Sequence, residues 1–119
     1  MRIILVDDER RIRSALRLLF DSEPEYTVVG EAENVNTLVP QVIAERPDIV
    51  LLDWDLLKNS DQFVFGLKDA YPQLAVLIMS GRPEVSRDAI RSGADAFFSK
   101  TDPPERLLQT LATINVGLV

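Results

Sequence analysis

Residues 49–53 read IVLLD, four apolar residues followed at once by a carboxylate. A run of this length is typical of a strand, and its lack of alternation indicates a strand covered on both faces, as in a parallel sheet. Similar runs occupy residues 3–6 and 75–79 and, more weakly, 27–29 and 96–98. The sequence therefore predicts five strands in the interior of the molecule.

Helical patterns separate these runs. Ile12, Leu16 and Leu19 recur at spacings of three and four over residues 9–21, which predicts one buried helix face. Alternation of strand and helix predicts an α/β fold, in which right-handed crossovers give a doubly wound, five-stranded parallel sheet with helices on both faces. The other helices are expected over 35–44, 63–70 and 85–93 and from Pro104 onward.

The helix expected over 35–44 contains a proline. Leu38, Val42 and Ile43 are expected to point inward. Pro40 lacks an N–H and is best tolerated in a first turn, so we expect this helix to begin late.

Composition narrows the possible chemistry. The 119 residues carry a net charge of −6 and include neither Cys nor His. This composition excludes disulfides, thiol catalysis, Ser-His-Asp catalysis and zinc sites built on Cys or His. An acidic domain is a poor candidate for direct nucleic-acid binding but suits metal cations and basic partner surfaces. The apolar run near Met1 is too short for a signal peptide, and no apolar run reaches about 18 residues, so we expect a cytoplasmic protein without a membrane span.

The residues that follow the predicted strands carry chemistry. Asp7 and Asp8 follow the first, Asp53 the third, Ser80 the fourth and Lys100 the fifth. In doubly wound sheets, ligands bind at the carboxyl ends of the strands, near the switch in strand order. Oxygen-only ligands favour Mg²⁺ or Mn²⁺, and a carboxylate can accept a phosphoryl group that a Lys and a hydroxyl stabilise.

Each residue also has an ordinary interpretation. Asp8 could simply cap the next helix, Ser80 and Gly81 could form a turn, and Lys100 could be a solvated surface charge. The joint pattern favours a site, because one fold would bring all the strand ends together.

At this point the sequence resembles the receiver domain of bacterial response regulators over nearly its whole length. Any one of the motifs that carry the resemblance is weak, but together they are specific. They are Ile4–Glu9, Ile49–Asp53, Val76–Gly81, Gly93–Phe97 and Phe98–Lys100.

The resemblance implies a flavodoxin-like (βα)5 fold with strand order 2-1-3-4-5. It also implies that Asp53 is the phosphoacceptor, phosphorylated by a histidine kinase, and that the domain catalyses only its own phosphorylation and dephosphorylation. For Mg²⁺ the resemblance implies Asp7, Asp8, Asp53 and the backbone carbonyl of Asp55 as ligands. For the phosphate it implies Ser80, Gly81 and Lys100 as stabilising residues. The conformational switch would involve Ser80 and Phe97. Core packing explains an aromatic residue at position 97 equally well.

The stretches Val28–Ala32 and Lys100–Glu105 resemble receivers of the NarL/FixJ type, which usually carry a DNA-binding output domain. We expect residues 1–119 to form a single receiver domain without an output domain, either a single-domain regulator or an excised receiver. Its expected partners are a histidine kinase and a downstream protein or output domain, and phosphorylation could produce a homodimer.

The loop over 55–63 departs from the family, because it lacks the usual Pro and Gly. We expect it to be longer, looser or differently placed, and we expect Arg82 to tune dephosphorylation. The loop is the one support for an alternative function, a receiver-like interaction module that does not use phosphate. A second alternative is a phosphatase of the haloacid-dehalogenase type, with Asp53 as the nucleophile and Asp55 as the general acid and base. It is less favoured, because those enzymes are larger and carry this pair of Asp residues after their first strand.

Overall fold

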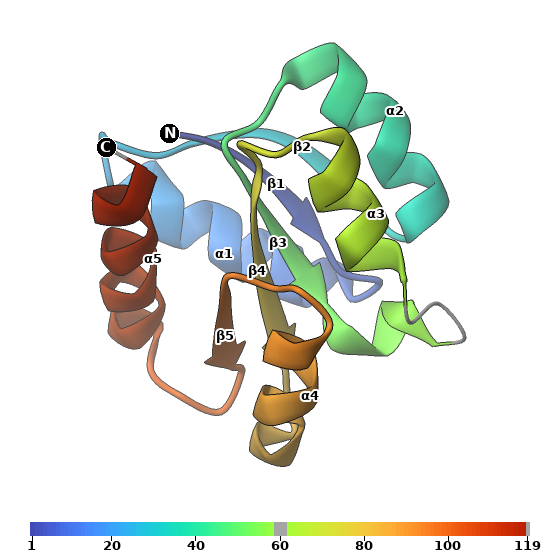
Figure 1. Cartoon of the computed structure of the whole chain (residues 1–119). Helices are drawn as coiled ribbons and strands as arrows, with labels where there is room; N and C mark the ends of the chain where they lie inside the picture. Colours follow the sequence, from blue (N-terminus) through green and yellow to red (C-terminus); the bar gives the residue numbers. More distant parts are fainter. Residues whose placement is uncertain (59–61, 119) are drawn as a thin grey trace.

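The computed structural model describes residues 1–58 and 62–118. In these residues one parallel sheet runs through the molecule, with the strand order β2-β1-β3-β4-β5 (Figure 1). This order is flavodoxin-like, and it confirms the fold predicted from the sequence. The strands are β1 Arg2–Val6, β2 Thr27–Ala32, β3 Ile49–Asp53, β4 Ala75–Ser80 and β5 Ala96–Ser99.

Helices cover both faces of the sheet. α1 and α5 lie against one face, and α2, α3 and α4 against the other (Figure 1). The α-helices are α1 Arg10–Asp21, α2 Val35–Glu45, α3 Phe63–Ala70, α4 Ser86–Arg91 and α5 Pro104–Leu118, and the 3-10 helices are η1 Trp54–Leu57 and η2 Pro83–Val85.

Successive strand residues enter two separate cores. On β1, Ile4 and Val6 pack with α2, α3 and α4, whereas Ile3 and Leu5 pack with α1 and α5. All four side chains are 0% exposed. Side chains alternate between the two faces of a strand, so a strand between two helix layers has to be apolar at every position. The unbroken apolar runs in the sequence follow from this arrangement.

The prediction of a late start for α2 was wrong. The helix begins at Val35, and Pro40 lies inside it. The side chain of Asn34 accepts a 2.9 Å hydrogen bond from the N–H of Thr37 and so caps the first turn. Asn34 therefore sets the start of the helix, and Pro40 costs one main-chain hydrogen bond within it.

The inward face of α2 is narrower than predicted. Leu38 and Val42 are buried, as expected, but Ile43 is 61% exposed. Leu38 and Val42 are four residues apart and share one side of the helix, whereas Ile43 is rotated by about 100° from Val42.

β2 is longer than the predicted 27–29 and contains a register shift. Ile3 pairs with Val28 but Ile4 pairs with Gly30, which leaves Val29 as an extra residue. Since a one-residue shift reverses the faces of all later residues, Val29 and Gly30 both lie on the α2 side and Glu31 turns toward α1.

The loop after β3 is described only in part. η1 follows Asp53 directly, and the described chain is interrupted after Lys58. The prediction of a loose loop includes residues 59–61, which lie outside the described residues. No described helix has the length and apolar character that crossing a membrane requires.

Candidate functional site

The acidic site lies where the strand order changes direction. β1 and β3 are neighbours, and the chain proceeds outward from them to β2 on one side and to β4 on the other. Asp7 directly follows β1 and Asp53 ends β3, so both carboxylates lie at the carboxyl ends of adjacent parallel strands. One carboxylate oxygen from each of Asp7, Asp8 and Asp53 lies within 4.8 Å of the others. Asp7 and Asp53 are buried and Asp8 is exposed, which leaves the site open on one side.

Lys100 joins the two buried carboxylates. Its Nζ lies 2.6 Å from Oδ2 of Asp7 and 3.3 Å from Oδ1 of Asp53. The backbone N–H of Lys100 donates a 2.8 Å hydrogen bond to the carbonyl of Ser80, which ties the end of β5 to the end of β4. Among the described residues, Oδ1 of Asp53 is a buried oxygen that accepts no hydrogen bond, despite its short distance to Lys100.

The site shifts the pKa of two of its members. Burial raises the pKa of the Asp53 carboxyl above its ordinary value, the ammonium of Lys100 opposes this rise, and the charge of Asp7 adds to it. Burial disfavours the charge on Lys100, but the hydrogen bond to Asp7 and the charge of Asp53 outweigh it and raise the pKa of Lys100. A further cation near Asp53 would therefore be favourable.

The donor set fits a hard divalent cation. Three carboxylates offer oxygen ligands only, and one buried oxygen of Asp53 lacks a hydrogen-bond donor. Mg²⁺ uses one or two carboxylates together with phosphate oxygens and water. In Asp7, Oδ1 accepts from the N–H of Glu9 at 2.9 Å and Oδ2 accepts from Lys100. A metal that uses Asp7 therefore has to share these oxygens with their present donors.

Ser80 and its neighbours lie beside the acidic site. Ser80 is 0% exposed and its Oγ accepts a 3.0 Å hydrogen bond from the N–H of Arg82, while Gly81 is exposed. Phe97 is half-buried on β5, where it packs against the core on the α2, α3 and α4 side. It also lines an open cavity of about 460 Å³ together with residues of η2, α4 and α5. This placement is compatible with both core packing and a switch.

An exposed ion pair lies beside the site. Nη2 of Arg82 lies 2.9 Å from Oδ1 of Asp55, and both side chains are about half exposed. Asp55 belongs to η1, directly after Asp53. The predicted roles of the Asp55 carbonyl in metal binding and of Arg82 in dephosphorylation remain predictions.

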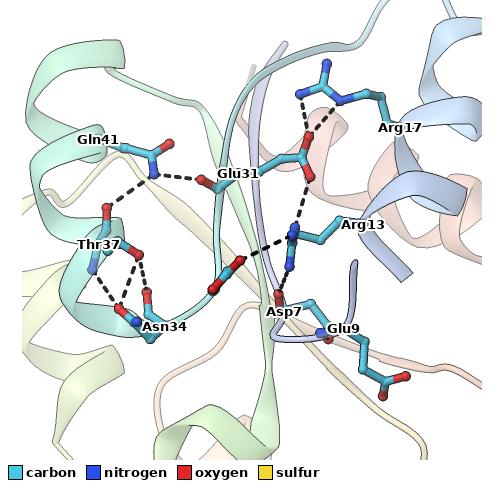
Figure 2. Close-up of polar contacts among 9 residues, drawn as sticks. Asp7, Glu9, Arg13, Arg17, Glu31, Asn34, Thr37 and Gln41 are labelled. Carbon is cyan, nitrogen blue, oxygen red and sulfur yellow. Dashed lines mark hydrogen bonds and ion pairs between the residues drawn. The ribbon is translucent and has the colours of Figure 1, made fainter. Parts of the chain in front are cut away.

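One residue beside the acidic site was not predicted from the sequence. Arg13 on α1 is 8% exposed and donates a 2.6 Å hydrogen bond from Nη1 to the backbone carbonyl of Asp7 (Figure 2). The signal was present in the sequence, because Arg13 comes three residues before Leu16 and seven before Phe20, on the inward side of the helix. A charged residue at such a position usually has a specific partner.

Comparison with known proteins identifies the family. The sequence model of the response regulator receiver domain matches residues 3–112. The chain therefore belongs to the response regulator receiver domain family, whose members are signalling domains of two-component systems and not classical enzymes.

The curated relatives of this chain include transcription regulators of the NarL/FixJ type. It is 32% identical to the DNA-binding transcriptional activator DevR/DosR of Mycobacterium tuberculosis, over 98% of this chain and 55% of that protein. It is 31% identical to the nitrate/nitrite response regulator protein NarL of Escherichia coli, over 97% of this chain and 55% of that protein. The chain thus spans about half the length of the curated relatives it matches.

Solved structures agree on the fold. A LuxR-family two-component response regulator from Aurantimonas sp. SI85-9A1 is 27% identical and superposes with a TM-score of 0.87, over 98% of this chain and 85% of that chain. The isolated receiver domain of RcsB from Salmonella enterica serovar Typhimurium, at 18% identity, has a TM-score of 0.86 over 98% of this chain and 89% of that chain.

Proposed function

We propose that this receiver is a phosphoacceptor switch in which a histidine kinase phosphorylates Asp53. The observation that carries the proposal is the state of Asp53, a buried carboxylate beside Asp7, Asp8 and Lys100 whose Oδ1 accepts no hydrogen bond. Residues 1–119 act as one receiver domain in this proposal, in the cytoplasm.

Each site residue has a defined part in the transfer. An oxygen of Asp53 attacks the phosphorus of a phosphohistidine, the new O–P bond forms as the P–N bond breaks, and the imidazole leaves. Asp7, Asp8, Asp53 and the carbonyl of Asp55 would hold Mg²⁺, which supplies positive charge to the phosphoryl oxygens. Lys100 and the hydroxyl of Ser80 stabilise the charge added at Asp53, together with the backbone N–H groups at Ser80 and Gly81.

The switch starts at Ser80. Its Oγ now accepts from the N–H of Arg82 at 3.0 Å, so turning toward the phosphate breaks this bond. Phe97 then moves into the space that Ser80 leaves, and the surface of α4, β5 and α5 changes shape. The phosphate thus shifts a balance between two states.

The output is a second part of the proposal. DevR/DosR is described as a DNA-binding transcriptional activator, and this receiver matches about half of that protein. We infer that the α4, β5 and α5 surface controls a downstream protein or an attached output domain, with a homodimer as one form of the phosphorylated state. The domain itself, with a net charge of −6, is not the part that binds nucleic acid.

The test uses Trp54, the single tryptophan of the chain, which adjoins Asp53. Its fluorescence is followed while Mg²⁺ and then acetyl phosphate are added, with Asp53→Asn as the control. We expect a metal-dependent change, then a slower change from the phosphodonor that is lost in the control, together with a rise in intact mass by one phosphoryl group. No response to either addition and an unchanged mass would indicate the phosphate-independent interaction module.

A further inference from the structure

A buried cationic side chain lies against the acidic site without belonging to it. Arg13 connects α1, β2 and the turn that follows β1 (Figure 2). We infer that Arg13 is a positioning residue for the metal site: it holds the peptide between Asp7 and Asp8, and Glu31 balances its charge. This inference rests on the proposed function and adds residues on which that function depends.

The contact of Arg13 with Asp7 is made at the end of a strand. The N–H of Asp7 still pairs with the carbonyl of Ala32 on β2 at 3.1 Å. The carbonyl of Asp7 lies beyond the ladder between β1 and β3, and the residue is 0% exposed, so this oxygen needs a donor within the protein. Arg13 provides it with a 2.6 Å hydrogen bond.

That carbonyl belongs to the peptide that links two metal-site residues. The orientation of the peptide plane sets the direction in which the chain continues to Asp8, because a peptide is planar. Asp8 is exposed and has an open side toward solvent. Fixing the peptide from Arg13 therefore limits the positions that the Asp8 carboxylate can adopt relative to Asp7 and Asp53.

Helix stability does not explain an arginine at this position. α1 begins at Arg10, and its first turn contains no acidic residue. The positive end of the helix dipole disfavours cationic side chains near the N-terminus. Burial of the charge on Arg13 adds a further cost, which specific partners have to offset.

Glu31 is the main charged partner of Arg13. Oε1 of Glu31 accepts from Nε of Arg13 at 3.0 Å, and Oε2 accepts from Nε of Arg17 at 2.8 Å. Glu33 lies further away, with 3.8 Å between its Oε1 and Nη2 of Arg13. The main-chain carbonyl of Glu31 accepts from Nε2 of Gln41 on α2 at 2.7 Å, so the residue is held from both sides of the sheet (Figure 2).

The pairing has an electrostatic consequence. An unbalanced cation beside Asp7 would oppose the binding of Mg²⁺, since like charges repel. Glu31 offsets the charge of Arg13, and the planar fork of the guanidinium remains as a rigid set of donors. The register shift in β2 is what turns Glu31 to the α1 side, where this pairing is possible.

The variants separate positioning from simple ion pairing. Arg13→Met alone leaves Glu31 without its buried partner and could prevent folding. The double variant Arg13→Met/Glu31→Gln removes both charges, keeps an acceptor for Arg17 and removes the donor to Asp7. Arg17→Met is the matched control, because it breaks an ion pair with the same Glu31 from the same helix but leaves the Asp7 contact intact.

Two readouts are needed, neither of which requires phosphorylation. Titration calorimetry with Mg²⁺ alone gives its dissociation constant, and the amide ¹⁵N shift of Asp8 reports on the peptide that Arg13 holds. In the double variant we expect a dissociation constant about tenfold higher, the size of effect seen when a partner of a metal ligand is removed, and a shifted Asp8 amide. Arg17→Met should have the same Mg²⁺ dissociation constant as the wild type. Arg13→Lys keeps the positive charge but not the planar fork of donors, so its dissociation constant should lie between those of the wild type and the double variant.

The outcomes distinguish the inference from the proposed function. Wild-type binding of Mg²⁺ with an unchanged constant in the double variant would overturn the inference alone. Equal weakening in Arg17→Met would overturn it too, because the loss would then follow from the ion pair with Glu31. A wild-type protein that binds no Mg²⁺ would overturn the proposed function and the inference together.

Discussion

Lys100 donates a 2.6 Å hydrogen bond to Asp7, although the two residues are 93 positions apart and their strands are not neighbours in the sheet. The carboxyl ends of β3 and β4 lie between them, and Asp53 at the end of β3 has its Oδ1 3.3 Å from the same Nζ. The one ammonium thus offsets part of the negative charge of two buried carboxylates. In the proposed function, a divalent cation held by Asp7, Asp8 and Asp53 would offset this charge as well, and Lys100 would then be available to the phosphate.

Replacement of Lys100 should separate metal binding from phosphorylation. In Lys100→Met the Mg²⁺ dissociation constant should fall by roughly tenfold, about 1.4 kcal/mol, because no cation competes for Asp7 and Asp53. The rate of phosphorylation by acetyl phosphate should fall by about 100-fold or more, because a donor to the added charge is lost. Calorimetry and intact mass over time measure the two effects.

Lys68→Met, which breaks an ion pair with Asp95 at the other end of β5, should change neither. Unchanged Mg²⁺ affinity in Lys100→Met would contradict the role assigned to the ammonium.

The fold was predictable because its signals are local and repeated. A strand between two helix layers has to be apolar at every position, and the runs around Ile49 and Val76 show this directly. The register shift at Val29 was not predictable, because it depends on pairing with β1 and not on the composition of β2. The start of α2 was missed because the proline received more weight than the cap at Asn34.

The acidic site was predictable in part. Asp7 and Asp53 stand at strand ends, and parallel strands end together at one edge, so their proximity follows from the fold. The contact of Arg13 with Asp7 was not predictable in the same way. It depends on the angle at which α1 packs on the sheet, and helical periodicity reveals only that Arg13 points inward.

Two glycines should respond to alanine in opposite directions. Gly93 has φ = +105°, and an added Cβ would lie 3.1 Å from the ring of Phe65, so Gly93→Ala should lower the free energy of unfolding by about 1–3 kcal/mol. Gly66 lies within α3 with nothing within 4 Å of an added Cβ, so Gly66→Ala should raise it by about 0.5–1 kcal/mol. Urea unfolding measures both. Equal effects in the two variants would argue against the left-handed conformation at Gly93.

Arg82 should act on the lifetime of the phosphorylated protein and hardly on stability. Its ion pair with Asp55 is exposed, and pairs of this kind contribute about 0–1 kcal/mol. Beside Asp53 the long side chain would limit the access of water to the phosphate. We expect Arg82→Ala to shorten the lifetime by roughly fivefold, about 1 kcal/mol in barrier height. The lifetime is measured by mass spectrometry, from the decay of the phosphorylated species after acetyl phosphate is removed. Arg87→Ala on α4 is the control. A lifetime equal to that of the wild type would remove Arg82 from the mechanism.

The burial of Asp53 should appear in the pH dependence of stability. Because burial raises the pKa of this carboxyl above the usual 3.8, the folded protein keeps the proton to a higher pH than the unfolded chain. The linked stability is fully present below the usual value and is lost as the pH rises through the raised pKa. The side chain of Asn in Asp53→Asn cannot ionise, so the variant does not lose this stability as the pH rises. Without metal, the free energy of unfolding of the variant should therefore rise relative to that of the wild type as the pH increases above the ordinary value of 3.8.

Urea unfolding at a series of pH values, with a chelator present, measures this difference. Saturating Mg²⁺ should make the wild type the more stable protein near pH 7. The cation binds the ionised carboxylates of the folded wild type and so stabilises the folded state. Asp69→Asn, at an exposed position on α3, controls for the loss of one negative charge. If Asp53→Asn and the wild type kept the same difference at every pH, the carboxylate of Asp53 would be held without a cost from burial. The case for a cation as its natural partner would then rest on the geometry of Asp7, Asp8 and Asp53 alone.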